Sequence, residues 1–324
     1  MRPRKHILVT GGAGFIGSHL VERLLALGER VVVVDDLSTG RLENLAAVAT
    51  HPALRVLTTK VSACRDLPRL AAGAGAIYHL AAAVGVELVV QRPIHVCRTN
   101  LRETEAVLEA AAPYAVPVLL TSTSEVYGKS AKRQFCEEDD LLIGPPTHAR
   151  WSYACSKLMD EFLALAYAHE RGLPVIIARV FNTVGPRQTG RYGMVLPRFI
   201  AAARAGQPLQ VYGDGRQTRC FCYVQDTVEA LIRLQQCPRA RGQVFNVGGT
   251  EEISIRNLAK LVIAVLGSSS RIQPVPYARA YAPGFEDLRR RKPRVTKLAR
   301  YTGFRPRTPL REIIRLTAAA TGPV

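Results

Sequence analysis

The stretch that decides the fold is Ile7-Leu8-Val9-Thr10-Gly11-Gly12-Ala13-Gly14-Phe15-Ile16-Gly17. Residues 7–10 are typical of a buried strand and run into a glycine-rich turn. An amphipathic pattern from about residue 16 to residue 27 then predicts a helix, and residues 30–35 predict a second buried strand. Uninterrupted apolar strands are typical of a parallel sheet covered on both faces, so the stretch predicts one strand–helix–strand unit.

Further apolar segments repeat this order along the chain. Strands are expected at 76–80, 116–120 and 174–178, with helical stretches around 100–112 and 156–171. Alternation of strand and helix predicts an α/β fold with a doubly wound parallel sheet, a Rossmann fold. We assign residues 1–180 to this first domain, with a return segment near 220–250. Residues 181–324 are assigned mainly to a smaller C-terminal α/β domain that binds substrate.

The composition indicates a globular protein. The chain has 324 residues, 48% of them hydrophobic and 22% charged, which excludes a disordered chain. No apolar run reaches the roughly 20 residues that cross a bilayer, and the first residues lack an apolar signal core. Seven scattered cysteines without a CxxC pair indicate a reduced protein. We therefore expect a cytoplasmic protein with no membrane association and no metal site.

The net charge raises one further class of partner. A formal charge of +18 would attract polyanions such as nucleic acid. The sequence has no helix-turn-helix, zinc or RNA-binding motif. No nucleic-acid partner is therefore expected, although the charge motivates one alternative below.

The glycine-rich turn predicts a dinucleotide site. Gly11 permits a tight turn, Gly14 lets a pyrophosphate approach the backbone, and Gly17 lets the helix pack on the sheet. The N-terminus of the helix favours phosphate. Asp35 ends the second strand, where a carboxylate accepts hydrogen bonds from ribose hydroxyls. Asp36 adds a charge that would repel a 2′-phosphate, so NAD is predicted rather than NADP.

A second pattern predicts acid–base chemistry. Tyr153 and Lys157 are four residues apart and share one face of a helix. The ammonium group is expected to stabilise the phenolate and to lower the pKa of Tyr153, which would make the phenol a base. Thr123 and Ser124 follow an apolar strand at the carboxyl edge of the sheet, where ligands bind. One of these hydroxyls is expected to hydrogen-bond the reacting oxygen.

Taken in order, these motifs resemble the extended short-chain dehydrogenase/reductases that act on nucleotide sugars. The resemblance covers nearly the whole chain, from the glycine turn through Tyr153 and Lys157 to segments 181–187, 211–215 and 217–221. It implies bound NAD, a UDP-sugar substrate oxidised transiently at C4, and a homodimer formed through the helices that carry Tyr153 and residues 100–112. It implies further cofactor contacts at Phe15, Ile16, Ser38, Thr39, Gly40, Leu80, Ala81, Ala82 and Asn100.

The same resemblance implies a nucleotide diphosphate site in the second domain. Arg219 suits bidentate phosphate binding, and Tyr212 offers a flat face to the uracil ring. Asn182, Val195 and Gln217 are expected to complete the contacts.

Three residues resemble the UDP-glucuronate decarboxylases of the family more than its 4-epimerases: Glu125 after Ser124, Arg150 before Tyr153, and Arg291 before a Lys-Pro pair. The implied reaction is C4 oxidation by bound NAD, loss of C6 as CO₂, protonation at C5, and re-reduction to UDP-xylose or release of the UDP-4-keto-pentose. Arg150 is expected to orient the carboxylate and Arg291 to act nearer C5. Glu125 either places an anion beside the leaving carboxylate or relays a proton.

Two alternatives stay open at this point. A UDP-glucuronate or UDP-glucose 4-epimerase would share every cofactor residue and the Tyr153–Lys157 pair. An NAD-bound regulator or nucleic-acid-binding protein of the same fold would explain the positive charge.

One residue departs from the family pattern. Lys60 lies where relatives usually offer an aspartate to the adenine amino group, and lysine cannot accept a hydrogen bond. Backbone groups near Val61 and Ser62 are expected to replace that contact. Four residues of an expected substrate-side loop stay without a role: Arg187, Gln188, Arg191 and Tyr192.

Overall fold

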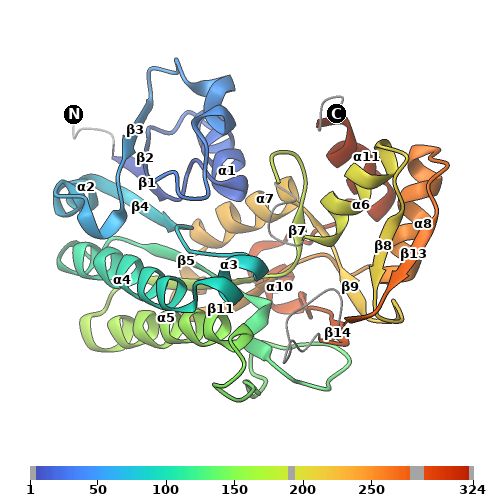
Figure 1. The fold of residues 1–324 in the computed structure, drawn as a ribbon. Helices are drawn as coiled ribbons and strands as arrows, with labels where there is room; N and C mark the ends of the chain where they lie inside the picture. The colour runs from blue at the N-terminus through green and yellow to red at the C-terminus, as the bar shows by residue number, and fades with distance from the viewer. Residues whose placement is uncertain (1–4, 189–193, 278–287, 321–324) are drawn as a thin grey trace.

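A computed structural model describes residues 5–188, 194–277 and 288–320. In these residues the larger unit is built on a seven-stranded parallel sheet (Figure 1). Its spatial order is β11-β6-β5-β4-β1-β2-β3. The strands are β1 (His6–Thr10), β2 (Val31–Asp35), β3 (Leu54–Thr58), β4 (Ala74–His79), β5 (Val118–Thr123), β6 (Val175–Val180) and β11 (Gln243–Val247).

The strand order reverses at β1. Strands β2 and β3 extend from one side of β1, and β4, β5, β6 and β11 extend from the other. In an open α/β sheet a ligand binds at such a reversal, outside the carboxyl ends of the strands. The predicted doubly wound Rossmann sheet is confirmed, and it places the glycine-rich turn at this point.

Helices cover both faces of the sheet because successive strand residues point to opposite sides. Val9 and Val33 lie in one core with α1 (Phe15–Ala26), α7 (Val224–Gln235) and α10 (Thr296–Thr302). Leu8 and Val34 lie in a second core with α2 (Leu67–Gly73), α4 (Pro93–Ala111) and α5 (Arg150–Arg171). Helices α4 and α5 run side by side on the outside of the molecule (Figure 1).

The smaller unit has a core of its own beside the carboxyl edge of the large sheet (Figure 1). Among the described residues it contains three small sheets, ordered β10-β7, β12-β9-β14 and β13-β8. Its strands are β7 (Thr183–Val184), β8 (Leu209–Tyr212), β9 (Thr218–Cys220), β10 (Cys222–Tyr223), β12 (Glu252–Ser254), β13 (Ile272–Val275) and β14 (Arg290–Arg291), and its helices are α6 (Val195–Arg204), α8 (Ile255–Leu266) and α11 (Leu310–Ala320).

The chain passes between the two units more than once. After β10 it returns to the large sheet, where α7 covers one face and β11 pairs in parallel with β6. It then enters the small unit and returns again as α10, which contacts α7 and β11. Helix α7 and strand β11 both lie within residues 220–250. The short helices are η1 (Leu42–Val48), η2 (Val61–Ala63), α3 (Val86–Gln91), η3 (Ala112–Tyr114), η4 (Ser124–Tyr127) and η6 (Pro238–Ala240).

Among the described residues, no helix has both the length and the apolar character that a membrane crossing requires.

Candidate active site

The glycine-rich turn between β1 and α1 leaves no room for side chains. Gly11 has a φ of +71°, and a Cβ there would lie 2.7 Å from the backbone nitrogen of Ala81. A Cβ on Gly17 would lie 2.1 Å from the carbonyl oxygen of Gly11. Gly14 is the N-cap of α1, and no described side chain caps that helix. The N–H groups of its first turn are therefore available to an anion.

Asp35, at the end of β2, is hydrogen-bonded to the backbone of this turn. Its two carboxylate oxygens accept hydrogen bonds from the backbone N–H groups of Ala13, at 2.9 Å, and Leu37, at 2.8 Å. Burial raises the pKa of Asp35, and these hydrogen bonds oppose that effect. The neighbouring Asp36 accepts from the N–H of Ser38 at 2.9 Å. Both predicted carboxylates therefore lie at the carboxyl end of β2.

A cleft of about 200 Å³ opens beside the turn. Its walls include most of the residues expected to bind the cofactor: Gly11, Gly14, Phe15, Ile16, Gly17, Asp35, Asp36, Ser38, Thr39, Leu80, Ala81 and Ala82. Gly40 packs instead against the turn, where a Cβ would lie 2.9 Å from the carbonyl carbon of Ala13.

Lys60 also lines the cleft, together with residues that the sequence reasoning did not select, among them Thr59, Thr99, Glu103 and Thr121. Glu103 accepts hydrogen bonds at 2.7 Å from both the N–H and the hydroxyl of Ser62. Thr99 and Glu103 are four residues apart and share one face of α4, and this spacing could have identified them in the sequence as residues of the cleft.

Asn100 has other partners in this structure. Its side-chain oxygen accepts from the N–H of Ala83 at 2.7 Å, and its amide donates to the hydroxyl of Ser156 at 3.0 Å. The residue is fully buried. Asn100 thus joins the loop after β4 to helix α5, and its predicted contact with the cofactor stays a prediction.

Tyr153 and Lys157 lie in the first two turns of α5, but their electrostatics differ from the expectation. The Lys157 ammonium group donates to Asp160 at 2.7 Å, and both side chains are almost completely buried. Burial, followed by the negative charge of Glu125, raises the pKa of Tyr153, and a hydrogen bond with Thr123 opposes this rise. The expectation that Lys157 holds the pKa of Tyr153 low is wrong for the chain alone, because burial of the phenol and the negative charge of Glu125 raise it.

Thr123 and Ser124 mark the end of β5 and the start of η4. The Thr123 hydroxyl accepts from the N–H of Glu125 at 3.2 Å and hydrogen-bonds to Tyr153. Ser124 is 1% exposed. Of the two candidates, Thr123 is therefore the hydroxyl in contact with the phenol.

Glu125 forms ion pairs with two arginines that are distant from each other in the sequence. One of its oxygens lies 3.0 Å from Arg150 at the start of α5, and the other lies 2.6 Å from Arg291 in β14. Burial would raise the pKa of Glu125, but the guanidinium groups of Arg291, Arg150 and Arg219 lower it to about 2. The structure thus brings together the three residues that resemble the decarboxylase pattern. We call this group the Glu125 cluster (Glu125, Arg150 and Arg291).

The remaining substrate candidates lie on the smaller unit. Arg219 in β9 is 7% exposed and donates to the carbonyl oxygen of Leu288 at 2.7 Å. The amide of Asn182 donates to the carbonyl oxygen of Cys220 at 3.0 Å, beside Arg219. These contacts attach Asn182 and Arg219 to neighbouring backbone at the edge that faces the Glu125 cluster.

Tyr212, Gln217 and Val195 form a second part of this unit. Gln217 donates to the carbonyl oxygen of Tyr212 at 3.1 Å, and Val195 begins α6. The guanidinium of Arg198, which sequence reasoning missed, lies 4.0 Å from the centre of the Tyr212 ring. In the sequence, its position one helical turn after Val195 would have indicated that Arg198 lies on the same face of α6 as Val195.

The expected substrate-side loop is only partly within the described residues. Arg187 donates to the hydroxyl of Ser18 at 3.2 Å and forms an ion pair with Glu22, so it faces α1. Gln188 donates to the carbonyl oxygen of Thr183 at 3.0 Å. Arg191 and Tyr192 lie outside the described residues.

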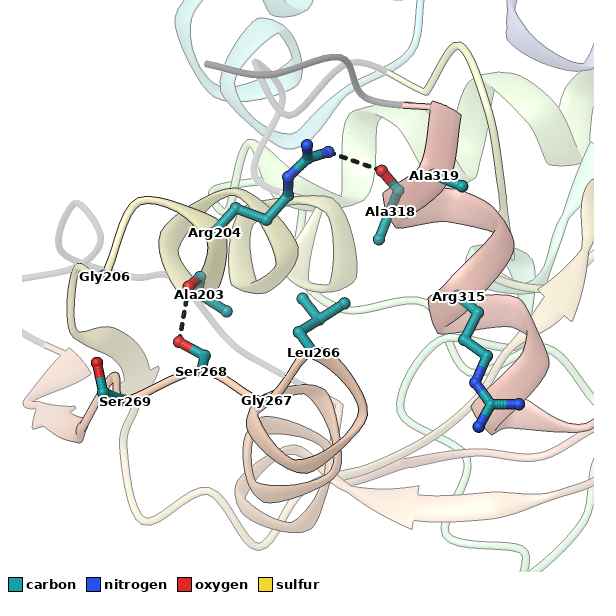
Figure 2. Close-up of a pocket in the computed structure, with 10 residues that line it drawn as sticks. All are labelled: Ala203, Arg204, Gly206, Leu266, Gly267, Ser268, Ser269, Arg315, Ala318 and Ala319. Carbon is teal, nitrogen blue, oxygen red and sulfur yellow. Dashed lines mark hydrogen bonds between the residues drawn. The ribbon is translucent and has the colours of Figure 1, made fainter.

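A larger hollow of about 650 Å³ lies elsewhere, where α6 and α8 end beside α11 (Figure 2). Arg204 spans it and donates to the carbonyl oxygen of Ala318 at 2.7 Å, and Ser268 donates to the carbonyl oxygen of Ala203 at 2.6 Å. The described residues that line it include no acid and no histidine. The hollow therefore lacks the acid–base groups that the smaller cleft has nearby.

The fold and the site together define a class of protein: a dinucleotide-binding enzyme of the short-chain dehydrogenase type, with a tyrosine–lysine pair at the carboxyl edge of its sheet. A family model described as the NAD dependent epimerase/dehydratase family matches residues 7–248. The chain belongs to this family.

Its relatives include sugar-nucleotide decarboxylases. A UDP-N-acetyl-alpha-D-glucosaminuronate decarboxylase of Bacillus cytotoxicus is 41% identical over 94% of this chain and 93% of its own length. UDP-glucuronic acid decarboxylase 1 of Arabidopsis thaliana is 35% identical over 96% of this chain and 68% of its own length.

Solved structures agree with the fold. UDP-glucose 4-epimerase from Thermus thermophilus, in complex with NAD, superposes with a TM-score of 0.84 at 31% identity and covers 98% of this chain and 100% of its own. A UDP-N-acetylglucosamine 4-epimerase from Methanobrevibacter ruminantium has a TM-score of 0.88 at 28% identity, over 98% and 97% of the two chains.

Proposed function

We propose that this protein is an NAD-dependent UDP-glucuronate decarboxylase. It oxidises the sugar at C4, releases C6 as CO₂, protonates C5, and either re-reduces the product to UDP-xylose or releases the UDP-4-keto-pentose. The observation that supports the proposal is the Glu125 cluster, in which two guanidinium groups share one carboxylate, and the charges of Glu125 and Arg291 both act on Tyr153. Both named decarboxylase relatives act on UDP-linked uronic acids, which is the substrate chemistry that paired arginines recognise.

The described residues fit NAD. The backbone of the glycine turn is open to a pyrophosphate because a Cβ at Gly11 or Gly17 would collide with neighbouring backbone. The Asp35 and Asp36 carboxylates line the same cleft, where ribose hydroxyls would meet them. When bound, NAD supplies the acceptor for the hydride that leaves C4 and returns it if the ketone is re-reduced.

Tyr153 acts as the base for the C4 hydroxyl. Its phenolate takes the hydroxyl proton as the C4–H bond breaks and the C4–O bond becomes a carbonyl. The Thr123 hydroxyl hydrogen-bonds to the phenol, so it holds the ring in place for this transfer. The raised pKa of Tyr153 in the chain alone means that the phenol needs additional positive charge nearby before it ionises at neutral pH.

The Glu125 cluster acts on the next step. Oxidation at C4 turns the uronic acid into a β-keto acid, whose C5–C6 bond breaks as its electrons move toward the C4 oxygen and CO₂ leaves. Arg150 orients the carboxylate, and Arg291 acts nearer the site where C5 is protonated. Firm binding of the carboxylate would stabilise the ground state and slow its loss. Glu125 counters this effect because it already shares both guanidinium groups.

The smaller unit binds the nucleotide. Arg219 binds the diphosphate, and the Tyr212 ring packs against the uracil, with Asn182, Val195 and Gln217 beside them. The Arg198 guanidinium over the Tyr212 ring fixes the orientation of that aromatic face.

The enzyme is a cytoplasmic homodimer in this proposal. The outer face of α4 and α5 exposes Ile94, Leu101, Met159 and Phe162, with Ile94 and Phe162 70% and 63% exposed. Burial of such an apolar face against a second copy is favourable. All seven cysteines are free thiols, as in proteins of a reducing compartment.

The test is incubation with UDP-glucuronate and NAD, followed by separation of the products. The proposal predicts CO₂ and a UDP-pentose or its 4-keto form. A parallel incubation with UDP-N-acetylglucosaminuronate reports the tolerance at C2. Clean conversion to UDP-galacturonate without CO₂ would identify a 4-epimerase instead. A salt-dependent shift of nucleic acid without turnover of any UDP-sugar would identify a binding protein.

A further inference from the structure

A buried carboxylate lies one helical turn beyond the catalytic lysine. Asp160 accepts a hydrogen bond from the Lys157 ammonium group at 2.7 Å, and the two side chains are 0% and 3% exposed. Burying an ion pair costs desolvation energy, and a well-packed apolar pair is often at least as stable. The pair is therefore poor evidence for a purely structural role, and the mechanism above assigns Asp160 no function.

Asp160 lies close to residues that lead to the foot of the cofactor turn. Thr104 of α4 is near enough to influence its carboxylate, and the Thr104 hydroxyl lies 3.1 Å from Nε2 of His79 in β4. Nδ1 of His79 lies 2.7 Å from the hydroxyl of Thr10, which directly precedes the glycine-rich turn. Burial and the nearby Lys157 charge lower the pKa of His79 to about 3. The imidazole is therefore neutral and links its two neighbours without adding charge.

The charges around Tyr153 come from several elements. Glu125 of η4 and Asp160 of α5 are negative, and Arg291 of β14 is positive. On α5 itself, Lys157 is paired with Asp160. Glu161 is held by Arg179 of β6 at 2.7 Å, so its charge is compensated away from the phenol.

The other sides of Tyr153 are uncharged. Thr123 of β5 offers a hydroxyl, and the ring packs against Ala83, Leu88, Val89 and Val96 from the loop after β4 and from α3 and α4. Asp160 is therefore the anion near the phenol that also holds the catalytic lysine.

We propose that Asp160 is a positioning residue for the Tyr153–Lys157 pair: it fixes the ammonium group in the site, and its negative charge sets the pH range in which Tyr153 accepts a proton. The inference rests on the proposed function only in taking Tyr153 as the base. Along α5, Asp160 lies seven residues from Tyr153, about 10 Å at 1.5 Å per residue. At an effective dielectric constant of about 20, one charge at that distance moves a titration by about one pH unit.

The experiment compares Asp160→Asn with wild type in the NAD-saturated enzyme. Ultraviolet titration of tyrosinate, with the matching Tyr153→Phe variant subtracted from each, isolates Tyr153. Removing the negative charge favours the phenolate, so its titration should move about one pH unit lower. The acid limb of kcat should move in the same direction. Asp160→Glu keeps the charge, and its titration should stay near wild type.

A matched control neutralises an acid on the same helix. Glu170 is exposed near the end of α5, so Glu170→Gln should change neither the titration nor kcat. A structural role for Asp160 would lower the thermal midpoint of Asp160→Asn and leave both pH readouts in place, and this result would overturn the proposal.

Two further experimental outcomes would each still decide whether Asp160 positions the lysine. If Asp160→Asn does not fold, Asp160→Glu still tests the positioning. It displaces the ammonium group by about one methylene, and kcat should fall about tenfold with the acid limb unmoved, whereas an unchanged kcat would refute the role. If wild type turns over no UDP-uronate but the Tyr153 titration still shifts in Asp160→Asn, the proposed function fails and the inference about Asp160 stands.

Discussion

Replacing Glu125 by glutamine removes the negative charge that lies between Arg150 and Arg291. In wild type these two guanidinium groups, 10% and 13% exposed, share the carboxylate at 3.0 and 2.6 Å. In Glu125→Gln they become two like charges in a mostly buried site with no carboxylate between them. Breaking a buried charge pair from one side is strongly destabilising. The variant should therefore unfold more easily than wild type at neutral pH.

The size of the effect follows from the pKa of Glu125. Its fall from 4.5 to about 2 corresponds to about 3 kcal/mol of stability that the ionised carboxylate contributes. Because the pKa is lower in the folded state, this contribution is complete above the unfolded value of 4.5 and disappears as the pH falls through about 2. The difference between wild type and Glu125→Gln should thus be about 3 kcal/mol at neutral pH and should shrink steadily in acid.

Urea unfolding over a series of pH values measures this difference. Trp151, the single tryptophan, is buried next to Arg150 and reports on the site by fluorescence. Glu138→Gln is the matched control, since Glu138 is 73% exposed and pairs with Lys297 at the surface. Its effect should stay below about 1 kcal/mol at every pH. Parallel stability curves for wild type and Glu125→Gln from about pH 7 to about pH 3 would refute the reasoning.

Three further predictions concern the cofactor site, the base and the dimer. Tyr153→Phe should lower the rate of C4 oxidation by at least about 10²-fold, because the base is lost. Calorimetry should find its affinity for UDP-glucuronate within about tenfold of the wild-type affinity. Near-normal turnover would reject Tyr153 as the base. Gly17→Ala puts a Cβ 2.1 Å from the Gly11 carbonyl oxygen. The purified variant should therefore retain little NAD, as measured by its absorbance, and normal retention would contradict the proposed turn geometry. Phe162→Glu should give a monomer by light scattering, since it puts a charge into the proposed apolar interface, and an unchanged dimer would move the interface elsewhere.

Local patterns were sufficient to predict the class of fold, but strand β3 (Leu54–Thr58), which lies at the edge of the sheet and is only partly buried, was not predicted. The apolar strands and the glycine turn occupy the predicted places, because parallel strands buried on both faces need continuous apolar runs. The ends of elements were less predictable. Strand β5 continues through Thr121, Ser122 and Thr123 because they pair with β6, and Ser122 is buried against Glu161. Polar residues of this kind look like a loop until their partners are known.

The site was predictable residue by residue but not as an arrangement. Glu125, Arg150 and Arg291 were each identified by resemblance, yet their ion pairs depend on β14 lying beside the start of α5, which no local pattern encodes. The Lys157–Asp160 pair shows the opposite case. Its spacing of three residues on one helix was visible in the sequence, but the expected effect of Lys157 on Tyr153 ignored the carboxylate. Burial of the phenol, followed by the negative charges of Glu125 and Asp160, decided the sign of the pKa shift.

A single turnover of UDP-glucuronate labelled with ¹³C at C6 is the most direct test of the central claim, that this site oxidises C4 and then releases the neighbouring carboxylate. Samples quenched at short times into borodeuteride would trap any C4 ketone as a C4–deuterium bond. We expect deuterium at C4 of a UDP-pentose, with the ¹³C label recovered in CO₂. Retention of the label in a UDP-hexuronate with inverted C4 would contradict the account.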